Sequence, residues 1–313
     1  MTGAAYFPPS VDRLPAGYEI HGQNTYRIEK YLGEGFTSVV YQAVMVDRDE
    51  RVALKILRPD ATVLARDNFW NESLVLSELM IAHADMAPKL IEAARQSQEG
   101  WGYIALEYID GKEFVDIGSL AEAGGLSEGE VLKFANQALE LLQRLHEQAG
   151  RTYTDMQLKN FLWNRPRQEL KVLDWNHVSL KKEYLTEDDY KASGVRNFQE
   201  LAQRDLYRLA AYLYKLLTGN GAYEKGEPRE ALANRAGTAW EKMSLATRQV
   251  LVNGLTTDAS RSYPNAGAFL EAVKEAATLV DPELVESNKQ VLFKKLKDYL
   301  ADAESAQTNL SNQ

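Results

Sequence analysis

The hydrophobic pattern is mainly strand-like before Gly111 and mainly helical after it, and this change limits the folds open to the chain. Before it, residues 25–57 alternate polar and apolar side chains in three short runs, which predicts a three-stranded antiparallel meander. Residues 103–109 predict a further buried strand, and residues 66–83 predict a helix. Beyond Gly111 the apolar residues recur mainly at helical spacing. We therefore expect an α+β fold with two lobes, a small antiparallel β-sheet lobe with one main helix and a larger, mostly α-helical lobe.

The pattern divides the 313 residues into four segments. Residues 1–25 are rich in proline and glycine and predict an extended leader without regular elements. Residues 26–109 form the predicted small lobe and a hinge, and residues 110–280 form the larger lobe. Residues 281–313 predict an amphipathic helix followed by a polar tail. That helix could pack on the larger lobe or on a second chain, so a homodimer through it is one alternative.

Capping residues mark helix boundaries in the larger lobe. Ser127 and Glu130 have the spacing of a capping box at the start of one helix. A second helix, residues 204–217, is apolar on nearly every face, opens with Asp205 and is followed by the stop signal Gly219. Further helices are predicted at residues 228–235, 239–253 and 265–279.

Charge and composition exclude several classes of protein. The net charge of −9 argues against broad binding to nucleic acid or to an anionic membrane, because both favour basic partners. No run reaches the roughly 18 apolar residues needed to span a membrane, and the first residues lack the order of a signal peptide. We therefore expect a cytoplasmic protein with no nucleic-acid partner and no membrane span. The absence of cysteine excludes disulfides, thiolate metal sites and cysteine nucleophiles.

Two acids and an amide in one stretch have a spacing that suits metal-dependent chemistry. Asn160 follows Asp155 by five residues, and Asp174 follows it by 19. Apolar runs at residues 161–163 and 170–173 predict a hairpin that returns Asp174 to the end where Asn160 lies. Three oxygen-bearing side chains around one point are what Mg²⁺ bridging phosphates requires. The alternative is an ordinary loop with turn residues and a solvated acid.

The small lobe supplies a second candidate group. Gly33 and Gly35 form a turn in which backbone amides can approach a ligand closely. Lys55 lies in an apolar run and needs a partner, and Glu72 lies on the predicted helix, where it can turn toward the sheet. We expect an ion pair between Lys55 and Glu72; the alternative is that both are surface charges. The apolar face expected on that helix comprises Phe69, Leu74, Leu76, Leu79 and Met80.

Taken in order, these features resemble the protein kinase superfamily: a glycine-rich turn, a strand lysine, a helix glutamate, a hinge, an Asp-x4-Asn motif, a strand-flanked aspartate and a buried helix that opens with Asp205. The resemblance covers about residues 25–280 and extends to the bacterial serine/threonine kinases of the eukaryotic-like type. It implies ATP and Mg²⁺ as cofactors. It also implies phosphoryl transfer to serine or threonine hydroxyls of protein substrates.

The resemblance implies roles for individual residues as well. The implied catalytic residues are Lys55, Glu72, Asp155 and Gln157, with Asp155 as the base that accepts the proton of the attacking hydroxyl. The implied metal ligands are Asn160 and Asp174. Asp205 would tie down the backbone of the catalytic loop. The implied nucleotide-binding residues are Leu32, Gly33, Gly35, Ser38, Val40, Ala53, Lys55, Leu106, Glu107, Ile109 and Leu162.

Five positions depart from the family pattern, and at one of them Trp175 stands for the phenylalanine after the metal-binding aspartate. Ser38 stands for the third glycine of the loop, Thr154 for the arginine before the catalytic aspartate, Gln157 for a lysine, and Asn176 for a glycine. The missing arginine normally pairs with a phosphate on the activation loop. We therefore expect activity without phosphorylation of residues 178–200.

The segment between Asp174 and Asp205 also lacks the Ala-Pro-Glu-like triplet of the part that docks protein substrates in the family. In the family, the glutamate of this triplet pairs with an arginine. Arg261 matches that arginine and would here need another acid as its partner, such as Glu200. These departures keep two alternatives open, a small-molecule hydroxyl kinase and a pseudokinase or nucleotide-binding scaffold.

Overall fold

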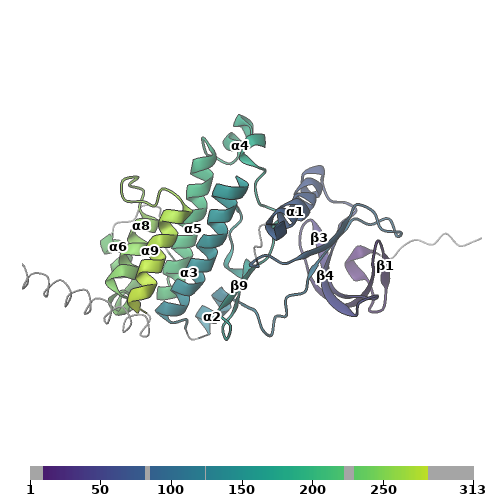
Figure 1. Cartoon of the computed structure of the whole chain (residues 1–313), viewed down its shortest axis with the longest axis horizontal. Coiled ribbons are helices and arrows are strands. Elements are labelled where there is room, and N and C mark those ends of the chain that lie inside the picture. Colours follow the sequence, from purple (N-terminus) through teal and green to yellow (C-terminus); the bar gives the residue numbers. More distant parts are fainter. Residues whose placement is uncertain (1–9, 82–84, 124, 222–228, 281–313) are drawn as a thin grey trace, which may run out of the picture.

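A computed structural model describes residues 10–81, 85–123, 125–221 and 229–280. The chain forms two lobes that lie side by side, one built on a β-sheet with a single long helix and one almost entirely helical (Figure 1). The predicted α+β architecture is confirmed. The amphipathic helix predicted in residues 281–313 lies outside the described residues.

A six-stranded antiparallel sheet forms the small lobe, with the strand order β1-β2-β3-β4-β6-β5. The strands are β1 Glu19–His21, β2 Thr25–Glu34, β3 Ser38–Met45, β4 Glu50–Leu57, β5 Leu90–Ala94 and β6 Tyr103–Glu107. The meander predicted from residues 25–57 is β2 to β4, and alternate side chains of β4 (Val52, Leu54 and Ile56) are buried. The strand predicted at residues 103–109 is β6.

Part of the predicted leader belongs to this lobe. β1 pairs with β2, and a 3₁₀ turn, η1 Val11–Arg13, lies just before it. The Tyr41 hydroxyl of β3 donates to the carbonyl of Val11 at 2.7 Å and accepts from the N–H of Leu14 at 3.1 Å. The prediction of a leader without regular elements is therefore wrong for residues 10–25. Elements of three residues leave no period in a sequence, and these depend on contacts with a distant strand.

The long helix of the small lobe, α1 Val63–Ile81, confirms the predicted helix but only part of its predicted face. Phe69 and Leu79 are buried, whereas Leu74 is 60% exposed and Met80 is 44% exposed. Because α1 carries apolar residues on both sides, spacing alone cannot select the side that faces the protein. Glu72 does point inward, with 1% exposure.

Eight helices of the larger lobe lie within the described residues. They are α2 Ile117–Glu122, α3 Glu128–Gln143, α4 Glu187–Ala192, α5 Phe198–Thr218, α6 Arg229–Ala236, α7 Thr238–Lys242, α8 Leu245–Leu255 and α9 Ala266–Val280. A π-helical turn, η2 Arg144–Ala149, continues α3. The 3₁₀ turns are η3 Leu158–Asn160 and η4 Lys182–Tyr184. In Figure 1, α3, α5, α8 and α9 lie side by side.

A small antiparallel sheet at the junction of the lobes joins β7 Val115–Asp116, β8 Phe161–Asn164 and β9 Glu169–Val172. β8 and β9 form the predicted hairpin, in the register that pairs Phe161 with Val172.

Capping confirms two predicted helix boundaries, the start of α3 and the end of α5. Ser127 and Glu130 form the capping box of α3, each side chain accepting from the other residue's backbone N–H. Gly219 ends α5 in the left-handed conformation, with a φ of 73°.

Two helix predictions need correction. α5 begins before residue 204, because Asn197 caps it by accepting from the backbone N–H of Glu200. The single helix predicted at residues 239–253 is wrong, since α7 and α8 are separate. Ser244 interrupts it and caps α8 by accepting from the backbone N–H of Thr247. None of the helices described combines the length and the apolar character needed to cross a membrane.

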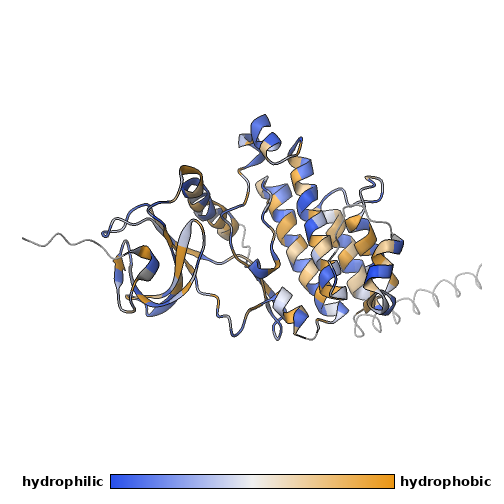
Figure 2. Cartoon of the chain, turned by 180° about the vertical axis from the view of Figure 1, so that it is seen from behind, coloured by the Kyte–Doolittle hydropathy of each residue, from blue (hydrophilic) through white to orange (hydrophobic). Residues whose placement is uncertain are grey.

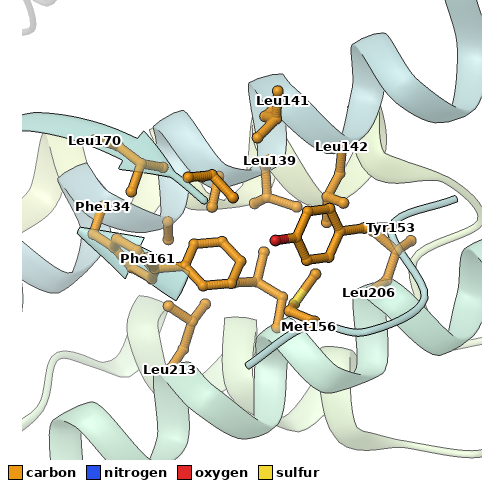
Figure 3. Packing of buried hydrophobic residues seen from close by; sticks show 14 of the residues in the cluster. Phe134, Leu139, Leu141, Leu142, Tyr153, Met156, Phe161, Leu170, Leu206 and Leu213 are labelled. Carbon is orange, nitrogen blue, oxygen red and sulfur yellow. The ribbon is translucent and has the colours of Figure 1, made fainter. Parts of the chain in front are cut away.

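Buried apolar residues form two clusters. One lies within the small-lobe sheet, and the larger runs from α1 through the helical lobe. Figure 2 shows hydrophobic and hydrophilic stretches alternating along the helices of that lobe. Figure 3 shows Tyr153, Met156 and Phe161 packed among leucines of α3 and α5. The stretch that carries the candidate catalytic residues is thus fixed by the core.

A buried carboxylate holds the edge of the small-lobe sheet. Glu92 of β5 is 6% exposed and accepts hydrogen bonds from the backbone N–H groups of Gln23 and Asn24, at 3.0 and 3.2 Å. The hydroxyls of Tyr26 and Tyr103 donate to it too. Burial opposes its charge, but these hydrogen bonds outweigh burial, so the pKa of Glu92 lies below its usual 4.5.

Replacing Glu92 with glutamine is expected to lower the free energy of unfolding near neutral pH by about 1–3 kcal/mol, the cost of a buried donor left unmet. Because its folded-state pKa is depressed, the carboxylate stabilises the fold above pH 4.5, and this advantage is lost as the pH falls through the folded-state value. Urea unfolding at neutral and acidic pH measures both effects. The control is Glu50→Gln, an exposed residue of β4; equal losses in the two variants would contradict the assignment.

Candidate active site

A cavity of about 610 Å³ lies between the lobes. Its walls come from the turn between β2 and β3, from β4 and β6, from the hinge after β6, and from residues around Asn160 and Asp174. The predicted nucleotide-binding residues that line it are Leu32, Gly33, Gly35, Ser38, Val40, Ala53, Lys55, Leu106, Glu107 and Ile109. Leu162, a half-buried residue of β8 that pairs with Lys171, is not among the lining residues. Leu173, after the hairpin, lines it instead.

The glycine-rich turn leaves open space beside the cavity. A Cβ atom at Gly33 would meet no atom within 4 Å, and at Gly35 it would meet only the carbonyl oxygen of Ser38, at 3.9 Å. The backbone N–H of Gly35 donates to that carbonyl at 2.8 Å, which closes the turn. Packing within the protein therefore does not require glycine here. The two glycines instead leave the backbone accessible to a ligand in the cavity.

Arg58, just after β4, holds this turn from behind. Its Nε donates to the carbonyl of Gly35 at 3.1 Å, and its Nη2 lies 2.7 Å from an oxygen of Glu34. Its Nη1 donates to Asp12 in η1. The arginine thus links η1 to the loop over the cavity. Sequence reasoning missed this residue, since no periodicity connects positions 12, 34 and 58.

Lys55 lies at the centre of a charged group in the wall of the cavity. Its Nζ is 2.6 Å from an oxygen of Glu72 and 3.8 Å from an oxygen of Asp174. Burial disfavours the charge of Lys55, but the two carboxylates outweigh burial and raise its pKa above the usual value. Glu72 also accepts from the backbone N–H of Trp175 at 3.4 Å. The predicted ion pair is confirmed and connects β4 to α1, while the hydrogen bond from Trp175 connects α1 to the residue after Asp174.

Asp155 lies on the loop before η3, half-buried and outside the cavity lining. Nε2 of Gln157 donates to both carboxylate oxygens of Asp155, at 2.9 Å each. These contacts fix the orientation of the carboxylate.

Asp205 in α5 anchors the same loop from inside the core. It is fully buried and accepts from the backbone N–H groups of Tyr153 at 2.8 Å and Thr154 at 3.2 Å. A ring nitrogen of His146 lies 3.0 Å from it. The carboxylate thus holds the backbone immediately before Asp155.

The hairpin returns Asp174 to the end of the sheet where Asn160 lies, as the sequence predicts. The backbone N–H of Leu173 donates to the carbonyl of Asn160 at 2.8 Å. Asn160 is 6% exposed, and its side-chain nitrogen has no hydrogen-bond partner among the described residues. Asp174 has a φ of 63°, in the left-handed region. The side-chain oxygens of Asn160 and Asp174 are of the kind that Mg²⁺ prefers as ligands.

Thr154 connects the loop of Asp155 to the segment after Asp174. Its φ is 55°, a strained value for a β-branched residue. Its hydroxyl donates to the carbonyl of His177, and its own carbonyl accepts from Arg208 of α5. Sequence reasoning missed Arg208, although its place three residues after Asp205 puts both on one helix face.

The partner suggested for Arg261 is not supported. Glu200 forms an ion pair with Arg196, whose Nε lies 2.6 Å from its carboxylate. Arg261 instead lies close to Asp258, to whose carbonyl its backbone N–H donates at 3.0 Å. The segment that lacks the Ala-Pro-Glu-like triplet forms η4 and α4.

Comparison with known proteins agrees with this geometry. Residues 26–273 match the family model described as "Protein kinase domain". The serine/threonine-protein kinase pkn3 of Myxococcus xanthus is 28% identical over 219 residues, which are 62% of this chain and 38% of that protein. The serine/threonine-protein kinase PknJ of Mycobacterium bovis is 27% identical over 274 residues, 80% of this chain and 45% of that protein. The serine/threonine-protein kinase ppk11 of Schizosaccharomyces pombe is 26% identical over 220 residues, 67% of each.

This chain spans less than half the length of the first two of these relatives. The family match nevertheless covers most of the chain, including both lobes and the cavity between them. The chain belongs to the protein kinase family.

Proposed function

We propose that this protein transfers the γ-phosphoryl group of ATP to serine or threonine hydroxyls of protein substrates, in the presence of Mg²⁺. The observation that carries the proposal is the group formed by Lys55, Glu72 and Asp174 in the wall of the cavity. In protein kinases the lysine–glutamate ion pair and the metal-binding aspartate must both be in place for transfer. The distances from Lys55 Nζ to Glu72, 2.6 Å, and to Asp174, 3.8 Å, agree with both conditions.

The chemistry is a displacement at phosphorus. The substrate hydroxyl oxygen attacks the γ-phosphorus while the bond to the oxygen bridging the β- and γ-phosphates breaks, and ADP leaves. Asp155 would orient this hydroxyl and accept its proton. Gln157 would keep the carboxylate in place through its two hydrogen bonds. Lys55 would neutralise oxygens of the α- and β-phosphates.

Asn160 and Asp174 would hold Mg²⁺. When bound there, the ion would offset negative charge on the phosphate oxygens. The protein's own contribution is to keep the two ligands at one end of the hairpin, through the hydrogen bond from Leu173 to Asn160.

One observation favours a second candidate, a nucleotide-binding scaffold without catalysis. Gln157 occupies both oxygens of Asp155, so a substrate hydroxyl would have to share the carboxylate with this amide. A small-molecule hydroxyl kinase is the third candidate, because the segment that docks protein substrates in the family is altered here.

Location and partners follow from charge. With a net charge of −9, we propose a cytoplasmic protein with protein substrates and without a nucleic-acid partner. A homodimer would use residues 281–313, which lie outside the described part of the chain.

Incubation with labelled ATP and Mg²⁺, alone and with casein as a generic protein substrate, tests the proposal. Transfer of label to protein is expected from the wild type, and about 100-fold or more should be lost in Asp155→Ala, since a general base contributes about that much. Lys55→Met should also lose activity. ATP-dependent thermal stabilisation without any turnover would favour the scaffold. Transfer only to small hydroxyl compounds would favour the third candidate.

A further inference from the structure

A buried arginine lies where α1, the catalytic loop and the segment after Asp174 meet. Arg151 precedes the catalytic loop and is 5% exposed. Its Nε and Nη2 donate to the two carboxylate oxygens of Glu78 in α1, at 3.0 and 3.3 Å. Its Nη1 donates to the carbonyl of Ser179 at 2.8 Å and to the side-chain oxygen of Asn71 at 3.3 Å. One guanidinium thus contacts two separate parts of the chain, α1 and the segment after Asp174.

Two further contacts connect α1 to the segment after Asp174. The Asn71 side-chain nitrogen donates to the carbonyl of Val178 at 2.7 Å. Nζ of Lys181 lies 3.2 Å from the Glu78 carboxylate. α1 is therefore held at two positions seven residues apart, and Glu72 directly follows the first of them.

The other side of this contact is held by the backbone. The N–H of Ser179 donates to the carbonyl of Thr152 at 2.9 Å, and the N–H of Thr152 donates to the Ser179 hydroxyl at 2.8 Å. The segment that contacts α1 is thereby fixed to the stretch that leads into Asp155. We refer to Asn71, Glu78, Arg151, Ser179 and Lys181 as the Arg151 cluster.

The charged contact between Arg151 and Glu78 fixes the geometry of this cluster. A two-pronged arginine–carboxylate contact is a strong and directional interaction. Burial works against the charge of Glu78, but Arg151 and Lys181 outweigh it and hold the pKa of that carboxyl below its usual value. Because Arg151 is almost fully buried, loss of Glu78 would leave its charge without its only carboxylate partner among the described contacts.

Thr154 gives the cluster its importance. This residue stands where the family has the arginine that binds an activation-loop phosphate, so the chain lacks that means of fixing α1. The Arg151 cluster connects α1 to the segment after Asp174 through an arginine, which is charged without any modification.

We propose that Arg151 is a positioning residue, which holds α1 against the segment after Asp174 and so keeps Glu72 on Lys55 without any phosphate on residues 178–200. This inference rests on the proposed function for its catalytic consequence. That an arginine holds α1 in place can be tested without phosphoryl transfer, by nucleotide binding and by hydrogen exchange of the α1 amides.

The test uses the full chain, treated with a non-specific phosphatase. The variants are Arg151→Met, Arg151→Lys, Glu78→Gln and the double variant Arg151→Met with Glu78→Gln. The matched control is Arg165→Met, which removes another arginine–glutamate pair, with Arg165 Nε 2.7 Å from Glu130. Arg165 lies on the turn between β8 and β9 and is far from α1 in sequence. Three quantities are measured: the Kd of Mg·ATP by calorimetry, hydrogen exchange of the α1 amides, and kcat and KM on casein.

In Arg151→Met, the Kd of Mg·ATP is expected to rise and kcat/KM to fall by about 10- to 100-fold, the range typical of coupling between two sites. The α1 amides should exchange faster. Arg151→Lys should retain part of the activity, since it keeps the charge without the two-pronged contact. The double variant should be no worse than Arg151→Met, because both changes break one contact. Arg165→Met should resemble the wild type.

Several results would overturn the inference: wild-type ATP affinity and α1 exchange in Arg151→Met, additive losses in the double variant, or a change equal to that of Arg165→Met. Activation of the wild type by orders of magnitude on phosphorylation of residues 178–200 would do so as well. Should Arg151→Met fail to fold, Glu78→Gln and Lys181→Met decide the question at less buried positions. If the wild type transfers no phosphate, the proposed function fails, while ATP affinity and α1 exchange still test Arg151.

Discussion

Replacing Asp174 with asparagine is expected to lower the rate of phosphoryl transfer by at least about 1,000-fold, since a metal ion supplies several kcal/mol of transition-state stabilisation and about 1.4 kcal/mol is a factor of ten. The change removes the charged member of the proposed metal site. Lys55 keeps its closer partner, because Glu72 lies at 2.6 Å and Asp174 at 3.8 Å. The loss should therefore fall mainly on kcat, with ATP binding retained in part.

Initial rates measured over a series of Mg²⁺ concentrations provide the test. The variant should need much more Mg²⁺ than the wild type and still remain slow at saturation. The control is Asp188→Asn, an exposed acid of α4 that contacts only Lys191 among the contacts described here. A rate within about tenfold of the wild type at saturating Mg²⁺ would remove Asp174 from the proposed site, because a metal ligand is worth more than that.

Asp205→Asn is expected to reduce both stability and activity. An asparagine would present an amide N–H where Asp205 accepts from the backbone of Tyr153 or Thr154, which leaves at least one buried donor unmet. The expected loss in the free energy of unfolding is about 1–3 kcal/mol. Because the same contacts hold the backbone before Asp155, kcat should also fall by about 100-fold, the cost of a misplacement near 1 Å.

Urea unfolding and kcat, measured under the same conditions, separate the two effects of Asp205→Asn. The exposed Asp258→Asn, which alters only a local turn with Ser260, is the control. A variant that loses stability but keeps wild-type kcat in its folded fraction would show that Asp205 supports the core without positioning the loop.

The sequence could place residues that lie in a clear hydrophobic pattern or whose contacts are close in the chain. A lysine flanked by apolar residues in a strand has few solutions other than an ion pair, and Lys55 with Glu72 forms that pair. The hairpin required only two apolar runs and a turn, and it sets Asn160 beside the residue before Asp174. In both cases local chemistry and the global fold favour the same arrangement.

The parts that could not be placed depend on contacts between distant segments. η1 and β1 are short and owe their positions to Tyr41 and β2. The exposed side of α1 resembles its buried side in hydropathy, so only the packed structure distinguishes Leu74 from Leu76. Arg151 has partners more than 70 residues earlier and 28 residues later, and no pattern in the sequence connects them.

The 3₁₀ turn and first strand before residue 26 also bear on how this protein should be dissected. The family match begins at residue 26 and ends at residue 273, so a fragment trimmed to those limits would lose the buried side chains of Val11, Leu14 and Ile20. It would also lose Asp12, one of the partners of the arginine that holds the glycine-rich turn, and the buried Ala276 of α9. The unit that folds is thus larger than the unit that homology marks. A minimal recombinant fragment should include residues 10–280.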